Sequence, residues 1–414
     1  MTKPEVINMG CRLNLAESHA LAQQLSSEGN LVIINSCAVT NEAVRQTRQA
    51  IRQARKRRPD ARIIVTGCAA QVEPDTFAAM PELDAVLGNV EKESPALFGH
   101  GLNERVRVSD IMAVRETAPH LATAFDSKTR AFVQVQTGCD HRCTFCIIPF
   151  GRGNSRSVPA GQIVDHIKQL VDGGCNEVVL TGVDVTSYGY DLPGAANLGL
   201  LVERILRHVP ALPRLRLSSV DGVEIDDRLF ALLTQEARLM PHVHLSLQSG
   251  DDMILKRMKR RHSRDQAIDL VTRLKSARPE IAIGADIIAG FPTEDDAMFA
   301  NSLDIIEQCD IVHGHIFPYS SKTGTPAARM PQIDPAIIKT RAKLLRDTVA
   351  MRRDAWLSAQ IGTTKTVLVE KSGRSGHAQD FALVELDADQ HPGSIITAHI
   401  TSAQNGSLQG MIQP

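Results

Sequence analysis

The chain has 414 residues, of which 43% are hydrophobic and 22% are charged. At roughly 150 residues per domain this length predicts about three domains, and the apolar content excludes wholesale disorder. The 46 Lys and Arg residues balance the 47 Asp and Glu residues, which excludes a uniformly basic coat for nucleic acid. No apolar run approaches the roughly 18 residues of a membrane span, and the amino terminus does not resemble a secretory signal. We therefore expect a cytoplasmic protein with no membrane partner.

The first part of the chain alternates short apolar runs with helical patterns. The predicted strands and the helices between them cover residues 6–9, 17–27, 31–35, 42–58 and 62–67. Alternating strands and helices indicate a parallel sheet that is covered on both faces. Cys11, Cys37 and Cys68 each follow one of the three strands. Because the carboxyl ends of parallel strands meet at one edge, we expect these distant thiols to lie close together.

A second α/β series begins after residues 89–128, whose weaker patterning is typical of a connection. Six apolar runs predict strands at residues 132–136, 177–181, 214–218, 242–247, 281–289 and 311–318. Five amphipathic segments predict helices at residues 161–171, 198–207, 227–238, 265–277 and 296–308. Repeated strand–helix units indicate a (β/α) barrel, and six units instead of the full eight predict an incomplete (β/α)6 barrel.

The pattern changes again near residue 362. Runs at 364–370, 381–386 and 394–401 alternate or are β-branched, and the glycine-rich segment 372–376 separates the first two. Short strands of this kind predict a small all-β barrel. The fold class is therefore α/β multidomain, with predicted domains at residues 1–125, 126–358 and 359–414.

Cys139, Cys143 and Cys146 form a C-x3-C-x2-C run directly after the first strand of the second series. Thiolates are the natural ligands of iron–sulfur clusters, and one short loop can direct three of them onto one 4Fe–4S cluster. A structural zinc site is the alternative, but it prefers four ligands in paired spacing. No fourth cysteine lies nearby, and ligation by His141 within the same compact loop is awkward.

This cysteine run resembles the signature of the radical S-adenosylmethionine enzymes. Segments 8–14, 35–42 and 66–69, each built around one of the earlier cysteines, resemble the amino-terminal domain of the methylthiotransferases. The segment 143–157 is most similar to the branch that modifies N6-threonylcarbamoyladenosine at position 37 of tRNA. The resemblance spans nearly the whole chain and includes a terminal β-domain of the TRAM type.

The resemblance implies a transferase with two 4Fe–4S clusters. Cys139, Cys143 and Cys146 would hold the cluster that binds and cleaves S-adenosylmethionine, producing a radical that takes hydrogen from C2 of the adenine. Cys11, Cys37 and Cys68 would hold an auxiliary cluster that presents the sulfur, so that the product is the 2-methylthio derivative. The implied partners are the anticodon loop of a tRNA and an electron donor such as a flavodoxin or ferredoxin.

Three other functions remain open at this point. The isopentenyladenosine branch of the same family shares both clusters and differs in how the base is held. Another branch modifies an aspartate of a ribosomal protein and needs no contact with tRNA phosphates. From a different class, the chain could be a zinc-stabilised RNA-binding module without catalysis.

Several residues at predicted strand ends match the family's cofactor motifs less tightly. The predicted S-adenosylmethionine contacts are Phe145, Asp184, Ser218 and Gln248. The alternative interpretation is that such residues only form the turns between strands and helices.

Basic residues cluster in two places that could bind RNA, residues 45–58 and residues 256–264. Seven of the fourteen residues from 45 to 58 are basic and none is acidic. The predicted RNA contacts are Arg45, Arg48, Arg52, Arg152 and Arg156. A solvated basic helix is the alternative for the first three.

Two features depart from the family pattern. The interval between Cys11 and Cys37 is short, as though a turn and a strand were missing. The terminal β-domain carries a net charge of −2, from three basic and five acidic residues, where a basic RNA-binding surface was expected.

Cys175 and Cys309 lie outside both cysteine sets, and core packing is their preferred interpretation. Trp356 is expected to pack between domains.

Overall fold

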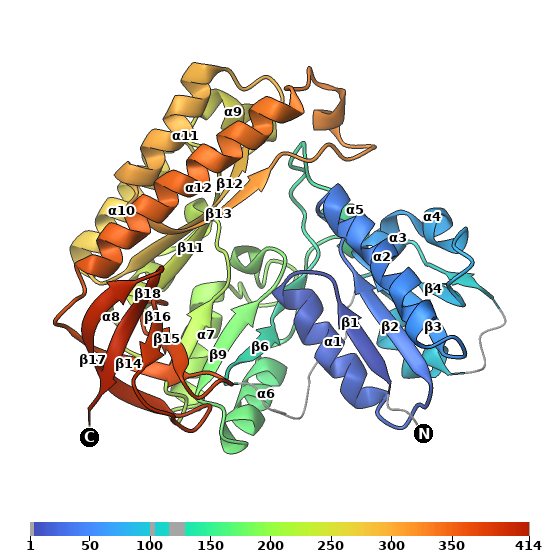
Figure 1. The fold of residues 1–414 in the computed structure, drawn as a ribbon, viewed down its shortest axis with the longest axis horizontal. Helices are drawn as coiled ribbons and strands as arrows, with labels where there is room; N and C mark the ends of the chain where they lie inside the picture. The colour runs from blue at the N-terminus through green and yellow to red at the C-terminus, as the bar shows by residue number, and fades with distance from the viewer. Residues whose placement is uncertain (1–3, 100–103, 116–128, 414) are drawn as a thin grey trace.

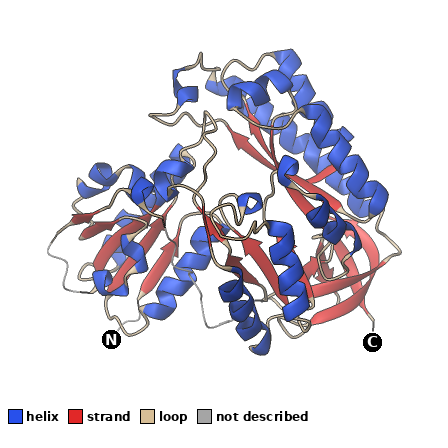
Figure 2. Cartoon of the chain, turned by 180° about the vertical axis from the view of Figure 1, so that it is seen from behind, coloured by secondary structure: helices blue, strands red, loops and turns tan. Residues whose placement is uncertain are grey.

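The computed structural model describes residues 4–99, 104–115 and 129–413. Three units follow one another along the chain: an amino-terminal α/β unit, a long curved α/β unit and a small β-barrel (Figure 1). Seen from behind, helices cover both faces of the first unit's sheet, whereas in the second unit they lie along the outer side of the strands (Figure 2). The predicted α/β multidomain class is confirmed. Among the described helices, none combines the length and the apolar character that crossing a membrane requires.

The amino-terminal unit is a five-stranded parallel sheet in the order β1-β2-β3-β4-β5. Its strands are β1 Glu5–Asn8, β2 Leu31–Ser36, β3 Arg62–Gly67, β4 Ala85–Leu87 and β5 Val106–Arg107. Its helices are α1 Arg12–Gln24, α2 Asn41–Arg57, α3 Cys68–Val72 and α4 Pro74–Ala78. Successive strand residues face opposite ways, so Ile33 and Ile64 pack against α1 while Val32 and Val65 pack against α2.

Two expectations for this unit need correction. The connection predicted at 89–128 contains β5, a two-residue edge strand too short to produce a periodic signal. Its residues 100–103 and 116–128 lie outside the described part of the chain. Helix α1 begins at Arg12, five residues before the predicted start, because Cys11 itself occupies the N-cap position.

The second unit is the predicted incomplete barrel. Its six strands are β6 Ala131–Gln134, β9 Glu177–Thr181, β10 Arg214–Leu217, β11 His242–Gln248, β12 Ala282–Ala289 and β13 Ile311–Pro318. They form two parallel three-stranded sheets, which single bridges at Leu215–Leu239 and Val220–Leu245 join. The outer helices are α6 Ala160–Asp172, α7 Leu198–His208, α8 Asp227–Gln235, α10 Arg264–Ala277, α11 Asp296–Gln308 and α12 Pro335–Ser358. The sequence did not indicate α5 Ile148–Arg152 or α9 Asp252–Met258.

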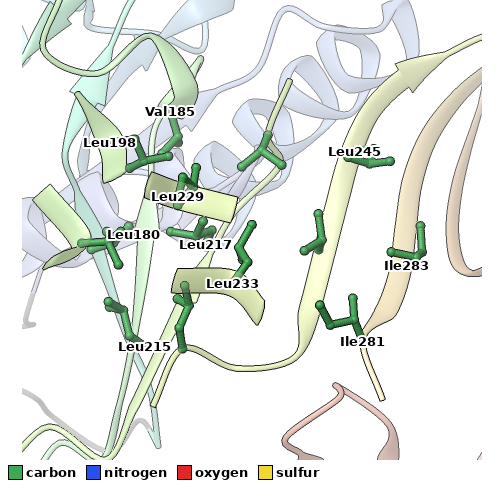
Figure 3. Packing of buried hydrophobic residues seen from close by; sticks show 14 of the residues in the cluster. Leu180, Val185, Leu198, Leu215, Leu217, Leu229, Leu233, Leu245, Ile281 and Ile283 are labelled. Atoms are coloured by element: carbon green, nitrogen blue, oxygen red, sulfur yellow. The ribbon is translucent and has the colours of Figure 1, made fainter. Parts of the chain in front are cut away.

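The core of the curved unit lies between these strands and helices. Figure 3 shows Leu215 and Leu217 of β10 packed beside Leu229 and Leu233 of α8. All four are almost fully buried, so truncating one to alanine would cost about 2–5 kcal/mol. Cys175 and Cys309 belong to this same buried cluster, as expected for cysteines without a chemical role.

The third unit is a closed five-stranded barrel in the order β14-β15-β16-β18-β17. Its strands are β14 Thr364–Val369, β15 Ser375–Ala378, β16 Leu383–Leu386, β17 Ile395–Gln404 and β18 Ser407–Ile412. Strand β15 occupies part of the segment predicted as a turn. A Cβ on Gly376 would lie 2.1 Å from the carbonyl oxygen of Leu368, so this glycine allows β15 to approach β14 closely.

The closed barrel docks on the amino ends of the curved unit's strands. Arg214 and Arg216, early in β10, donate hydrogen bonds to the carbonyl oxygens of Thr366 and Ala378, both at 2.8 Å. Phe381 stacks on His242 with the ring centroids 5.0 Å apart. Its φ of 70° ends the extended backbone there, which explains why β16 begins at Leu383. Trp356 packs between His313 and the closed barrel, as predicted.

Candidate metal and cofactor site

Cys11, Cys37 and Cys68, called here the sheet trio, lie at the carboxyl ends of β1, β2 and β3. Cys11 caps α1, Cys37 directly follows β2 and Cys68 begins α3. The three strands are neighbours in parallel register, so their ends align. Burial, with the adjacent Cys68 and Cys11, raises the pKa of the Cys37 thiol to about 11. The fold therefore brings together three thiols that are far apart in the sequence.

Cys139, Cys143 and Cys146, called here the loop trio, come from one loop above β6. The short strands β7 Gln136–Thr137 and β8 Arg156–Ser157 pair and close this loop. The Gln136 side-chain amide donates to the carbonyl oxygen of Gly138 at 2.8 Å and to Ser155 Oγ at 2.9 Å. Gly138 has a φ of 71°, and a Cβ there would lie 1.9 Å from the carbonyl oxygen of Asn154. Only glycine fits at this corner.

Charged groups surround the loop trio. Cys139 Sγ lies 3.7 Å from Asp184 Oδ2, and Cys143 Sγ lies 3.9 Å from Arg260 Nη1. Burial raises the pKa of the Cys146 thiol to about 12. Burial, followed by the Asp184 carboxylate, raises the pKa of Cys139 as well. These two thiols are therefore protonated at neutral pH unless a metal stabilises the thiolate.

The two trios are joined by α5, which follows the loop trio directly. Ile147, just before α5, belongs to the core of the amino-terminal sheet. A Cβ on Gly151 would lie 3.1 Å from the Cβ of Cys68. The Asn89 side chain donates a hydrogen bond to the Gly151 carbonyl oxygen at 2.5 Å. The loop trio and the sheet trio are thus neighbours across the boundary between the first two units.

A buried cluster of charges lies beside Cys68. Arg152, at the end of α5, donates from Nε to Cys68 Sγ at 3.1 Å and forms an ion pair with Glu17. Lys92 Nζ lies 2.7 Å from Glu17 Oε2 and 2.7 Å from Asn89 Oδ1. Burial opposes the charge of Arg152, but Cys68 and Glu17 hold its pKa well above the usual range. Glu17 thus pairs with two basic side chains, Arg152 and Lys92, in a buried site beside the sheet trio.

The spacing of the sulfurs bears on which metal they fit. Within the described residues, no cysteine sulfur belongs to a set of three or more His, Cys, Asp or Glu ligand atoms lying within 4.8 Å of one another. Two sulfurs on a single zinc ion would be about 3.8 Å apart, given a Zn–S bond of about 2.3 Å. In a 4Fe–4S cluster each thiolate binds a different iron, so the sulfurs lie farther apart. The described cysteines therefore do not form the compact set that a single zinc ion requires.

Three of the predicted cofactor contacts lie near the mouth of the curved unit. Phe145 meets Phe291 edge to face, with the ring centroids 6.3 Å apart. Ser218 Oγ is buried and has no hydrogen-bond partner within the described chain. Gln248 ends β11 with a φ of 72°. A buried hydroxyl without a partner is costly, so a polar ligand atom at Ser218 fits this site. All three remain predictions.

Asp184, the fourth predicted cofactor contact, is already engaged. It lies 3.0 Å from His141 Nε2 and accepts a hydrogen bond from Ser187 Oγ at 2.8 Å. Hydrogen bonds with Asp184 and then Glu224 raise the pKa of His141 to about 9. His141 is therefore a cation at neutral pH, and its Nε2 faces carboxylates.

The predicted RNA contacts divide into two groups. Arg45, Arg48 and Arg52 of α2 are at least partly exposed, but each lies within 4 Å of a carboxylate on the same unit. Arg152 and Arg156 are only 4% and 6% exposed. Arg156 donates to the backbone carbonyl of Arg152 at 3.1 Å, while Arg152 is committed to Glu17 and Cys68. Both side chains are thus buried and engaged within the protein, unlike the three arginines of α2, and their contact with RNA stays a prediction.

Sequence reasoning missed the buried polar residues that support the two trios. Glu17, Asn89, Lys92 and Gln136 carry hydrogen bonds that fix Arg152 or the loop backbone. Lys92 lies in the segment predicted as a connection, where no pattern marked it. The one available signal was a polar residue placed among buried positions, such as Gln136 after β6.

Comparison with known proteins identifies the family. Residues 133–306 match the family model "Radical SAM superfamily", and residues 3–88 match "Uncharacterized protein family UPF0004". The threonylcarbamoyladenosine tRNA methylthiotransferase MtaB of Rickettsia prowazekii is 48% identical over 98% of this chain and 97% of its own length. The MtaB of Bacillus subtilis is 35% identical over 81% of this chain and 78% of its own length. The chain therefore belongs to the radical S-adenosylmethionine methylthiotransferases, in the branch of the threonylcarbamoyladenosine tRNA enzymes.

Solved structures confirm the fold. The radical S-adenosylmethionine methyltransferase TsrM of Kitasatospora setae, solved with cobalamin and a [4Fe–4S] cluster, superposes with a TM-score of 0.55 at 15% identity, covering 79% of this chain and 74% of its own. At this identity the likeness concerns the architecture alone. Because the chain is a radical S-adenosylmethionine enzyme, a 4Fe–4S cluster and S-adenosylmethionine are its cofactors.

Proposed function

We propose that the protein converts N6-threonylcarbamoyladenosine at position 37 of tRNA to its 2-methylthio derivative. The observation that carries this proposal is the contact of α5 with Cys68, which makes two three-thiol sites neighbours. One trio alone would fit many radical enzymes, whereas a second trio beside it provides a place for a sulfur donor. The shared name of the relatives supports the substrate.

In this proposal the loop trio holds one 4Fe–4S cluster and the sheet trio holds a second. When bound, the clusters and S-adenosylmethionine supply the radical that activates C2 of the adenine, the inserted sulfur and its methyl group. Each cluster has four irons and three cysteine ligands, so one iron remains available for S-adenosylmethionine or for the sulfur.

The chain's own residues position and protect these groups. Arg152 donates a hydrogen bond to Cys68 Sγ, and Glu17, itself paired with Lys92, holds Arg152 in place. Gln136 and Gly138 hold the backbone of the loop trio. Phe145, Ser218, Gln248 and Asp184 contact S-adenosylmethionine.

The substrate and the electron source complete the proposal. The anticodon loop binds at the shared edge of the two units, where Arg45, Arg48 and Arg52 contribute to phosphate binding. Bases in such loops are already partly unstacked, so presenting the adenine requires no duplex opening. A flavodoxin or ferredoxin supplies the electron.

Mass spectrometry of tRNA nucleosides from a strain lacking the gene tests the substrate. We expect loss of the 2-methylthio derivative of threonylcarbamoyladenosine and accumulation of its unmodified precursor. Loss of the isopentenyladenosine derivative would instead assign the chain to that branch. Unchanged nucleosides together with an unmodified ribosomal-protein aspartate would move the substrate to protein.

Metal analysis after anaerobic purification tests the two-cluster assignment. We expect about eight irons per chain, with an equal amount of sulfide. In the Cys139→Ala, Cys143→Ala, Cys146→Ala variant we expect one cluster by electron paramagnetic resonance and no cleavage of S-adenosylmethionine. Zinc without iron would support the non-catalytic RNA-binding module, and cleavage at the normal rate by the variant would contradict the division of roles.

A further inference from the structure

A pocket of about 520 Å3 lies beside the mouth of the curved unit, outside both trios. It is bounded by the end of the edge strand β13, the loop that follows it and the first half of α12. Pro318, Tyr319 and Ile338 give it apolar walls, and Lys339 and Arg346 stand at its side. Pockets of this size hold small organic ligands or single nucleotides.

The pocket is a built feature of the fold. Helix α12 begins at Pro335 with Asp334 as its N-cap, and residues 338, 339, 342 and 346 follow along one face. Gly290, with a φ of 70°, lets Ile338 approach the mouth, because a Cβ at Gly290 would lie 2.6 Å from Ile338 Cγ1. The apolar wall is therefore held by packing between α12 and the loop after β12.

The charged residues that line the pocket are all basic. No aspartate or glutamate lines it, while Lys339 and Arg346 are both exposed. Neither has a carboxylate oxygen within 4 Å among the described residues, and Arg346 makes only a 3.4 Å contact with the carbonyl oxygen of Ile316. The α2 arginines, in contrast, already have carboxylate partners. Two free cations beside apolar walls suit a ligand with a phosphate and a flat apolar face.

The wall of the pocket is also fixed to both cysteine sites. Ser320 Oγ accepts a hydrogen bond from the backbone N–H of Asn41 at 3.1 Å, and the carbonyl oxygen of Ser321 accepts from the Asn41 side chain at 3.0 Å. Asn41 lies four residues after Cys37. Farther along the loop, the N–H of Ala327 donates to the carbonyl oxygen of Thr144, next to Cys143, at 2.9 Å. The pocket thus shares one loop with the two trios.

From this placement we infer that the pocket binds a nucleotide adjacent to the modified adenosine. Its base lies against Pro318, Tyr319 and Ile338, and its phosphate is bound by Lys339 and Arg346. Stacking and charge together suit single-stranded RNA and require no particular base. The inference rests on the proposed function, because it needs an RNA substrate at this edge.

The first test measures binding of a synthetic anticodon stem–loop that carries threonylcarbamoyladenosine. We expect Lys339→Ala and Arg346→Ala each to weaken binding several-fold and to reduce the slope of log affinity against log salt by about 0.7, as for one lost contact with a single-strand phosphate. Lys343→Ala is the matched control, since Lys343 is exposed on the same helix but paired with Asp347 at 2.5 Å. It should leave affinity and slope unchanged.

The second test concerns the base. An RNA with an abasic nucleotide next to the modified adenosine should bind the wild-type protein more weakly than the intact RNA does. The Tyr319→Ala variant should bind the abasic and the intact RNA with equal affinity. Equal effects of the abasic RNA on both proteins would overturn the base contact. Wild-type affinity and salt slope in both Lys339→Ala and Arg346→Ala would overturn the phosphate contact. If the wild-type protein neither binds nor methylthiolates the stem–loop, the proposed function fails instead.

Discussion

The two cysteine sites lie side by side but are built in different ways. The loop trio comes from eight consecutive residues, and a local hairpin with two positive-φ glycines, Gly138 and Gly153, sets its shape. The sheet trio comes from three strands spread over 58 residues and exists only when β1, β2 and β3 align. A charge from the second unit, Arg152, then completes the sheet trio. One site therefore depends on local backbone geometry, and the other depends on the whole fold.

Removing Arg152 should produce the largest difference between the two sites. In Arg152→Gln the buried Glu17 loses one of its two cations and Cys68 loses its N–H donor, so we expect a loss of about 3 kcal/mol in the free energy of unfolding. Urea unfolding of the metal-free protein measures this loss. After reconstitution we expect about four irons, all on the loop trio. Arg45→Gln is the exposed control and should leave the free energy of unfolding unchanged. Equal loss of both clusters would contradict the dependence of the sheet trio on Arg152.

Gly138→Ala tests the opposite dependence. The new Cβ would overlap the carbonyl oxygen of Asn154, and a φ of 71° is strained for alanine, so the loop must distort at a cost of about 1–3 kcal/mol. Cleavage of S-adenosylmethionine should fall at least tenfold while the spectroscopic signal of the sheet-trio cluster persists. Gly161→Ala, where a Cβ meets nothing within 4 Å, is the matched control. Normal cleavage by Gly138→Ala would show that the corner tolerates a side chain.

Of the three changes, acidification should have the smallest effect on stability. It should act through Glu224, which lies beside the loop trio. Burial alone would raise the pKa of Glu224, but hydrogen bonds from His141 and Arg261 lower it to about 2. A carboxyl whose folded pKa is depressed stabilises the fold above its unfolded pKa of about 4.3, and this contribution is lost as the pH falls toward 2. Allowing for solvent screening, we expect about 1 kcal/mol.

Urea unfolding at pH 6 and pH 3 measures this contribution. The stability difference between wild type and Glu224→Gln should shrink on acidification, whereas Glu203→Gln, at an exposed position on α7, should show a constant difference. A difference that grows as the pH falls would contradict the assigned direction.

The same contrast explains what the sequence could predict. Strands such as β2 and β12 are continuous apolar runs, and the C-x3-C-x2-C spacing is local, so both could be predicted from the sequence. The convergence of Cys11, Cys37 and Cys68 followed from the rule that parallel strands end at one edge. The role of Arg152 could not be predicted, because its partner Glu17 is 135 residues away. The sequence analysis named this arginine as an RNA contact, whereas the packing of α5 buries it.

The position of the terminal barrel has a consequence for water inside the curved unit. Phe381 and its ring partners His242 and His377 fill the end of that unit opposite to the cysteine loops. Glu177 and Arg216, which are paired at 3.0 Å, lie just behind these rings and are shielded from solvent by them. A chain cut before residue 359 would therefore expose the buried Glu177–Arg216 pair to water.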